Sequence, residues 1–199
     1  MYRTTMLFAA ATVWLSCVLA GCQDKPWKSE AKQEEAASKH SQIIGSPAPD
    51  FTLPDQNDKP VTLSALKGQW VVLYFYPQDD TPGCTCEATE FTTALASFGQ
   101  MNARVYGISG NSPASHRAFI TAYKLKIDLL SDGPDHKVMR EYGAWVDASL
   151  GEKTYGRVIR TTMIIDPNGV IRYHWPEVVP NGHAERVRQK LAQLQAGSK

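Results

Sequence analysis

The chain has 199 residues, of which 43% are hydrophobic, 21% charged and 10% aromatic, and its formal net charge is +1 at pH 7. This composition is ordinary for one globular domain with a real core, and it excludes collagenous, coiled-coil and disordered chains. The balance of 21 basic against 20 acidic residues argues against a nucleic-acid binder that relies on a broad basic surface. Four cysteines are too few for a disulfide framework, so each is interpreted individually.

The first 21 residues are typical of an export signal. Arg3 precedes an apolar run, residues 6–20, that ends in small residues, as secretory signals do. The run is short for a spanning helix, which needs about 20 apolar residues. Leu19-Ala20-Gly21-Cys22 resembles the lipobox of bacterial lipoproteins, which implies a signal peptide over residues 1–21 and a lipid on Cys22. An uncleaved anchor or an ordinary signal is the alternative.

The expected mature chain begins at Cys22 and is anchored by lipid without spanning the membrane. Residues 22–42 are polar and mixed in charge, which predicts a flexible tether. We therefore expect the protein on the periplasmic face of a bacterial membrane, in the cell envelope. Cys84 and Cys86 would then be the redox-capable thiols, working in an oxidising compartment.

Residues 43–199 predict a single α/β domain. Residues 70–76 form an unbroken run of β-branched and aromatic side chains, typical of a strand buried on both faces of a parallel or mixed sheet. Residues 51–53 and 61–63 flank a polar turn and predict an N-terminal β-hairpin. A helix from Cys84 and a strand over residues 104–108 complete a βαβ unit.

The remaining elements follow from capping and turn signals. Ser112 and Pro113 supply the N-cap and first position of a helix that continues to Tyr123. The further predicted elements are a strand at 127–130, a helix at 135–142 ended by Gly143, a hairpin of 158–165 with 170–175, and a helix from about His183. The pattern shows no internal repeat and no second domain boundary.

The residues after the buried strand carry the chemistry. They read Pro77-Gln-Asp-Asp-Thr81-Pro-Gly-Cys84-Thr-Cys86, with a helix beginning at or near Cys84. A thiol at that place meets unpaired amide donors and the positive end of the helix dipole, which favour the thiolate. Gly83 lets the backbone approach whatever the sulfur attacks. These features predict a nucleophile rather than a structural cysteine.

Pro77, Thr81 and Cys84 match Pro-x-x-x-Thr-x-x-Cys, and this stretch resembles the active-site signature of the peroxiredoxins. Residues 79–85 are similar to the PrxQ branch, also called bacterioferritin-comigratory-protein-like, of the AhpC/TSA family in the thioredoxin-like superfamily. Residues 158–169 resemble the strand that carries the family's arginine, here Arg160, and residues 181–183 also resemble the branch. The resemblance covers about residues 43–195.

The resemblance implies a thioredoxin-like fold, with a central mixed sheet flanked by helices, and a thiol peroxidase that needs no cofactor or metal. Cys84 would reduce hydrogen peroxide and organic hydroperoxides and become a sulfenic acid. Arg160, Thr81 and the backbone amides of Gly83 and Cys84 would stabilise the developing charge, and Pro77 would shield the site from water. The branch is often monomeric, so we expect a monomer.

The recycling step departs from the branch. The position five residues after Cys84, which often carries a resolving cysteine, is Thr89, and residues 112–125 contain no cysteine. Cys86 is the candidate resolving residue, but positions i and i+2 of a helix point about 200° apart, so a disulfide with Cys84 requires the first turn to unwind. We therefore favour reduction by an external thiol or a thioredoxin-like protein.

Other functions fit the sequence less well. A zinc site lacks a second close pair of Cys or His ligands, and the five histidines are scattered and are given no catalytic role. A membrane-tethered thiol–disulfide oxidoreductase of thioredoxin type is the alternative enzyme, although the chain has no Cys-x-x-Cys motif. A redox-inert binding lipoprotein would not need Thr81, Cys84 and Arg160 together.

Overall fold

The structure is a computed structural model that describes residues 43–150 and 153–197. The predicted signal peptide, the lipid site at Cys22 and the tether lie outside these residues. In chain order the elements are β1 (Thr52–Pro54), β2 (Pro60–Thr62), the 3-10 helix η2 (Leu63–Leu66), β3 (Trp70–Phe75), α2 (Pro82–Gln100), β4 (Ala103–Ser109), α3 (Pro113–Tyr123), β5 (Asp128–Ser131), α4 (Lys137–Glu141), β6 (Trp145–Leu150), β7 (Lys153–Val158), β8 (Thr161–Ile165), β9 (Ile171–Trp175) and α5 (His183–Ala196). Within the described ranges no helix combines the length and apolar character that crossing a bilayer requires.

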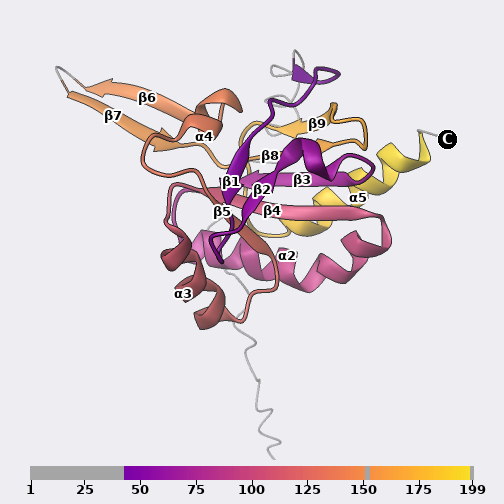
Figure 1. The fold of residues 1–199 in the computed structure, drawn as a ribbon, viewed down its shortest axis with the longest axis horizontal. Helices are drawn as coiled ribbons and strands as arrows, with labels where there is room; N and C mark the ends of the chain where they lie inside the picture. Colours follow the sequence, from indigo (N-terminus) through magenta and orange to yellow (C-terminus); the bar gives the residue numbers. More distant parts are fainter. Residues whose placement is uncertain (1–42, 151–152, 198–199) are drawn as a thin grey trace, which may run out of the picture.

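A five-stranded mixed sheet forms the centre of the domain (Figure 1). Its strand order is β5-β4-β3-β8-β9, with β3 parallel to β4 and β4 parallel to β5, whereas β8 runs antiparallel to both β3 and β9. The N-terminal hairpin of β1 and β2 forms a separate antiparallel pair. The predicted mixed sheet with its hairpin is therefore confirmed.

Strand β3 is buried along its whole length because it lies in the middle of this sheet. Its side chains alternate between two cores, as the period of a strand dictates. Val72 and Tyr74 pack with residues of α2 and α5 on one face. Leu73 and Phe75 pack on the other face, against residues from the N-terminal hairpin and α4. The unbroken apolar run in the sequence reflects this two-sided burial.

The helix signals in the sequence give accurate positions. Ser112 is the N-cap of α3, its side chain accepts a hydrogen bond from the Ser115 amide at 3.3 Å, and Pro113 opens the helix. Gly143 follows α4 with a φ of 67°, in the left-handed region that stops helices. Helix α2 begins at Pro82 with Thr81 as its N-cap, so Cys84 lies in its first turn.

The segment before β8 differs from the prediction. The expected single strand over residues 158–165 is two strands, because β7 ends at Val158 and β8 begins at Thr161. Strand β7 pairs with β6 in a hairpin that projects from the body of the domain (Figure 1). The hairpin was not predicted because residues 145–158 lack the regular alternation of apolar and polar side chains that indicates a strand. Its place in the chain puts Arg160 at the junction between a projecting element and the central sheet.

Candidate active site

Cys84 lies where the first turn of α2 meets the carboxyl end of β3. Its thiol is free, and the residue is only 2% exposed. The first amide N–H groups of a helix have no partner within the helix, and the helix dipole adds partial positive charge there. The structure thus places the Cys84 sulfur at the start of a helix, as predicted.

Arg160 approaches Cys84 from the other side of the site. Its Nη2 donates a hydrogen bond to Cys84 Sγ at 3.2 Å, although the two residues are 76 positions apart in the chain. The Val178 amide donates to the Arg160 carbonyl at 2.9 Å and fixes its backbone. The Arg160 side chain is 13% exposed. The structure therefore brings together Cys84 and Arg160, the two residues predicted to act together.

Glu87 is a third member of the site and was not among the residues predicted from the sequence. Its carboxylate forms an ion pair with Nη1 of Arg160, and the residue is completely buried. Burial raises the pKa of this carboxyl to about 7, against the opposing effect of the Arg160 charge. Residues three apart on a helix share a face, so the spacing from Cys84 to Glu87 was a usable signal.

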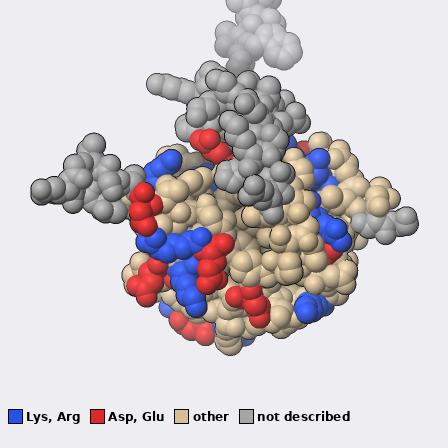
Figure 2. Space-filling model, turned by 90° about the horizontal axis from the view of Figure 1, so that it is seen from above, with Lys and Arg blue, Asp and Glu red and all other residues tan. Residues whose placement is uncertain are grey.

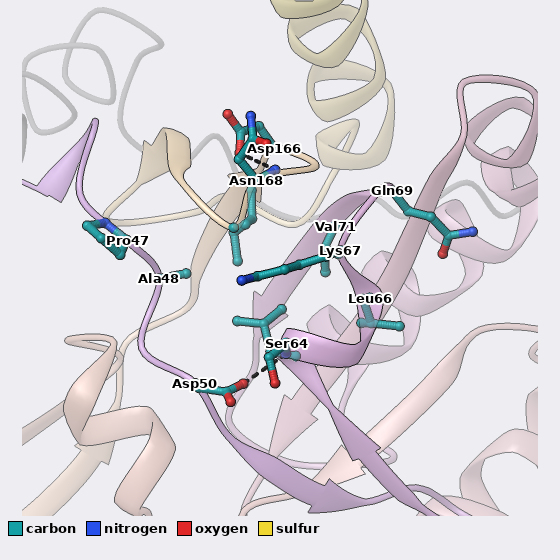
Figure 3. A pocket seen from close by; sticks show the side chains of 13 residues that line it. Pro47, Ala48, Asp50, Ser64, Leu66, Lys67, Gln69, Val71, Asp166 and Asn168 are labelled. Atoms are coloured by element: carbon teal, nitrogen blue, oxygen red, sulfur yellow. Dashed lines mark hydrogen bonds between the residues drawn. The ribbon is translucent and has the colours of Figure 1, made fainter.

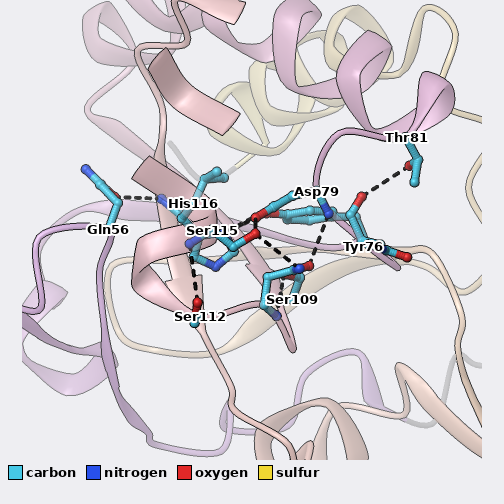
Figure 4. Close-up of polar contacts among 11 residues, drawn as sticks. Gln56, Tyr76, Asp79, Thr81, Ser109, Ser112, Ser115 and His116 are labelled. Atoms are coloured by element: carbon cyan, nitrogen blue, oxygen red, sulfur yellow. Dashed lines mark hydrogen bonds and ion pairs between the residues drawn. The ribbon is translucent and has the colours of Figure 1, made fainter. Parts of the chain in front are cut away.

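Thr81 and Gly83 form the loop side of the site. The Thr81 hydroxyl donates to the Gln78 carbonyl at 3.1 Å and makes no capping bond to α2 (Figure 4). Since its hydrogen is used there, its oxygen remains an acceptor for a ligand hydroxyl. A Cβ at Gly83 would lie 3.6 Å from Arg160 Nη2 and 3.4 Å from the Pro180 ring. These are ordinary van der Waals distances, so the backbone of Gly83 lies next to the guanidinium with room for no more than a small side chain.

Pro77 and Cys86 are the remaining predicted site residues. Pro77 is exposed on the loop after β3, and its shielding role stays a prediction. Cys86 is buried and is not bonded to Cys84, whose thiol is free. It lines a groove of about 450 Å³ between α2 and α5, and Arg160 is not among the residues that line this groove. Its role as a resolving residue stays a prediction.

His183 is the first residue of α5 and is buried. Its Nε2 is 2.9 Å from the Thr162 hydroxyl, and its ring packs edge-on against Phe91 and Trp175. Burial lowers the pKa of its imidazole well below the ordinary value, with further lowering from the charges of Arg186 and Arg160. A neutral imidazole in this place joins α5 to β8.

A second cavity lies at the opposite end of the sheet. It measures about 260 Å³ and is lined by apolar side chains together with Asp50, Lys67 and Asp166. Figure 3 shows the Lys67 side chain extending across it. No cysteine lines this cavity, and none of the described residues forms a cluster of His, Cys, Asp or Glu that could hold a metal ion. Neither Cys84 nor Arg160 lines this cavity.

The surface charge is mixed. On the face shown in Figure 2, basic and acidic side chains lie side by side and form no large patch of only positive or only negative charge. This agrees with the net charge of +1.

A family model described as the AhpC/TSA family matches residues 44–174. The chain belongs to this family. A putative peroxiredoxin bcp from Coxiella burnetii is 43% identical over 148 residues, which make up 74% of this chain and 97% of the relative. The chloroplastic peroxiredoxin Q of Sedum lineare is 42% identical over 151 residues, 75% of this chain and 78% of that protein.

Solved structures agree with the sequence relatives. A structure of the bacterioferritin comigratory protein of Xanthomonas campestris, described in connection with its alkyl peroxide reduction activity, has a TM-score of 0.68 and 32% identity, and the match covers 75% of this chain and 92% of that one. The peroxiredoxin family, its thioredoxin-like fold and the thiol peroxidase class are thus confirmed. Within the AhpC/TSA family, this chain resembles the PrxQ branch.

Proposed function

We propose that this chain reduces hydrogen peroxide and organic hydroperoxides with Cys84 as the attacking sulfur. The observation that carries the proposal is the hydrogen bond from Arg160 Nη2 to Cys84 Sγ at 3.2 Å, in the first turn of α2. A fixed positive charge beside a sulfur at a helix start stabilises the thiolate, which is the nucleophilic form. The same donors face the region where negative charge develops during attack.

The chemical step is a displacement at oxygen. The Cys84 thiolate attacks one oxygen of the hydroperoxide, an S–O bond forms and the O–O bond breaks. The other oxygen leaves with the electron pair and takes up a proton to become water or an alcohol, while Cys84 is oxidised to the sulfenic acid. Thr81 would accept the hydrogen bond of the bound hydroperoxide, and Arg160 would stabilise the leaving oxygen.

The return step uses an external thiol. One thiol attacks the Cys84 sulfenic acid, releases water and forms a mixed disulfide, and a second thiol or a vicinal thiol of the same reductant then releases Cys84 and leaves an oxidised reductant. A small thiol or a thioredoxin-like protein supplies these groups. Resolution by Cys86 is the competing route, and it requires the first turn of α2 to unwind, since the two side chains point to different sides of that helix.

The decisive experiment follows the mass of the intact protein. Cys17 and Cys22 are replaced by serine in the full-length chain, so that Cys84 and Cys86 are its remaining cysteines. The reduced protein, in detergent, is treated with less than one equivalent of hydrogen peroxide. The same background with Cys84→Ser and with Cys86→Ser provides the comparison.

A gain of one oxygen that requires Cys84 but not Cys86 supports the proposed cycle. A loss of two hydrogens that requires both cysteines would assign resolution to Cys86. Absence of a fast reaction at Cys84 would overturn the peroxidase proposal, and rapid reduction of a model protein disulfide would then favour the thiol–disulfide oxidoreductase.

We further propose that the mature protein is a monomer, held by lipid on Cys22 to the periplasmic face of a bacterial membrane. The residues 19–22 and the polar stretch after them support this location. Cells labelled with a radioactive fatty acid should incorporate label into the wild type and none into Cys22→Ser. Sedimentation of the detergent-extracted protein tests the monomer. Label in both forms would overturn lipidation at Cys22, and a dimer in sedimentation would overturn the monomer.

A further inference from the structure

A buried polar cluster lies beside the loop that leads into the active site (Figure 4). Its centre is Asp79, which is 7% exposed. The Asp79 carboxylate accepts hydrogen bonds from the Tyr76 hydroxyl at 2.7 Å, the Ser115 hydroxyl at 2.7 Å and His116 Nδ1 at 2.9 Å. Two of these three donors belong to α3. The loop after β3 is therefore tied to a helix that follows the next strand of the sheet.

The backbone of Asp79 is held as well. Its amide donates to Asn111 Oδ1 at 3.1 Å, and the Ser109 hydroxyl donates to the same oxygen at 3.0 Å. Ser109 ends β4 and Asn111 precedes α3. Because β3 and β4 are parallel, their carboxyl ends lie at one edge of the sheet, which is why these residues meet.

The imidazole of His116 is completely buried. Since an ionised carboxylate only accepts hydrogen bonds, Nδ1 carries the hydrogen that faces Asp79. The Asp79 pKa is affected most by burial, which raises it, but the hydrogen bonds from His116, Ser115 and Tyr76 outweigh burial and lower it. The carboxylate is therefore the stable form, and the tie to α3 persists at neutral pH.

The next residue of the loop has its own contact with α3. The hydroxyl of Tyr123, at the end of that helix, donates to Asp80 Oδ1 at 2.5 Å. Asp80 has a φ of 58°, in the left-handed region that costs a residue other than glycine about 1 kcal/mol or more. Tyr123 is 42% exposed, so this hydrogen bond lies at the surface of the domain.

These two contacts immediately precede the reacting residues. Thr81 follows Asp80 and is the N-cap of α2, and Cys84 is three residues further on. Pro77 and Gln78, on the other side of Asp79, are exposed. The orientation of the Thr81 hydroxyl and of the first amides of α2 therefore depends on where Asp79 and Asp80 are held.

We propose that Asp79 and Asp80, held by His116 and Tyr123 of α3, are positioning residues for the peroxide step. This inference rests on the peroxidase function proposed above. The anchors keep Thr81 and the first turn of α2 in the geometry that a small hydroperoxide requires, and they keep Cys84 covered. Residues 112–125 contain no cysteine, so α3 can hold the loop throughout the cycle without delivering a thiol to Cys84.

Two reactions of Cys84 distinguish positioning from a general structural role. Oxidation by hydrogen peroxide needs aligned donors, and misplacement of such groups by about 1 Å can cost about 10²-fold in rate. Alkylation by iodoacetamide mainly needs an accessible thiolate. A loosened loop should therefore slow the first reaction and speed the second, whereas loss of thiolate would slow both.

The test uses Tyr123→Phe and Asp79→Asn in the full-length chain. Tyr155→Phe is the control for loss of an exposed tyrosine hydroxyl, since Tyr155 is 52% exposed on β7. Asp166→Asn is the control for loss of a buried carboxylate, because Asp166 accepts three hydrogen bonds at the opposite end of the sheet. Each protein is oxidised and alkylated at one pH, and modification at Cys84 is quantified by peptide mass.

We expect Tyr123→Phe to slow peroxide oxidation of Cys84 about fivefold and Asp79→Asn about 10-fold or more, with faster alkylation in both and unchanged rates in both controls. His116→Asn, which retains an N–H donor near the position of Nδ1, should preserve more activity than His116→Leu. Unchanged peroxide rates in both test variants, or parallel changes in the two reactions, would overturn the positioning role. A wild type that does not react with peroxide would instead overturn the proposed function, and the alkylation rates would still report on the anchors.

Discussion

Arg160 joins Cys84 to Glu87. One nitrogen of its guanidinium donates to the sulfur at 3.2 Å, and another pairs with the buried carboxylate of Glu87. Both partners lie on the first two turns of α2, three residues apart. The planar guanidinium can make both contacts at once, which a lysine ammonium cannot do with the same geometry. The site therefore depends on the shape of the arginine side chain as well as on its charge.

Arg160→Lys should slow the oxidation of Cys84 by hydrogen peroxide by about 10²–10³-fold. The reason is that loss of one prearranged donor to a developing negative charge typically has an effect of about that size. Stopped-flow measurement under pseudo-first-order peroxide gives the rate constant. Arg172→Lys is the control, because Arg172 pairs with Asp166 by a hydrogen bond of 2.7 Å remote from Cys84. A rate within threefold of wild type for Arg160→Lys would contradict this role.

Thr81→Val should slow the peroxide step by about 10–100-fold, while Thr81→Ser should keep most of the rate. Valine preserves the shape of the side chain but removes the oxygen that is left free to accept a hydrogen bond from the hydroperoxide, and hydrogen bonds that involve developing charge contribute about 1.5–3 kcal/mol. The same stopped-flow assay compares the two variants. Equal rates for Val and Ser would show that the hydroxyl does not contact the peroxide.

Glu87 should make stability fall as the pH rises towards neutrality. Burial raises the pKa of its carboxyl from 4.5 to about 7, so the folded protein holds this proton more tightly than the unfolded chain does. Its contribution is complete below about pH 4.5 and is lost as the pH rises to about 7. The free energy of unfolding of wild type, relative to Glu87→Gln, should decrease by about 1.6 kcal/mol between pH 5.5 and 7.

Urea unfolding at several pH values measures this difference. Glu185→Gln is the matched control on α5. Hydrogen bonds from Arg188 and Gln189 lower the pKa of the Glu185 carboxyl to about 2. This group is therefore ionised from pH 5.5 to 7 and contributes almost nothing to the pH dependence of the free energy of unfolding. A Glu87→Gln curve parallel to wild type would mean that the Arg160 charge keeps Glu87 ionised at pH 5.5.

Most of the fold could be predicted from the sequence because its elements carry strong local signals. Strand β3 is an unbroken apolar run, and α3 begins with a serine cap and a proline. The hairpin of β6 and β7 was not predicted, since residues 145–158 do not alternate between apolar and polar side chains. The break at Ile159 and Arg160 follows from that hairpin and was missed with it.

The residues of the site also differ in how well the sequence predicts them. Thr81, Gly83 and Cys84 are neighbours in the chain, so a local motif was enough to find them. Arg160 was placed by resemblance to a family strand, and its contact with Cys84 depends on β8 lying next to β3. The contact between Asp79 and His116 spans 37 positions in the chain. It depends on the parallel pairing of β3 with β4, and the spacing of residues in the sequence does not predict this pairing.

Gly107→Ala should destabilise the protein by about 1–3 kcal/mol, the usual effect of overpacking a core. Gly107 lies in β4, where a Cβ would come within 2.5 Å of the Tyr74 ring and 2.7 Å of the Leu129 side chain. Gly99→Ala is the matched control near the end of α2, since a Cβ there meets nothing within 4 Å. Alanine should stabilise that helix by up to about 1 kcal/mol. In urea unfolding at neutral pH, the midpoint of Gly107→Ala should therefore be lower than that of wild type and the midpoint of Gly99→Ala higher. Equal midpoints for the two variants would show that Tyr74 can shift without cost.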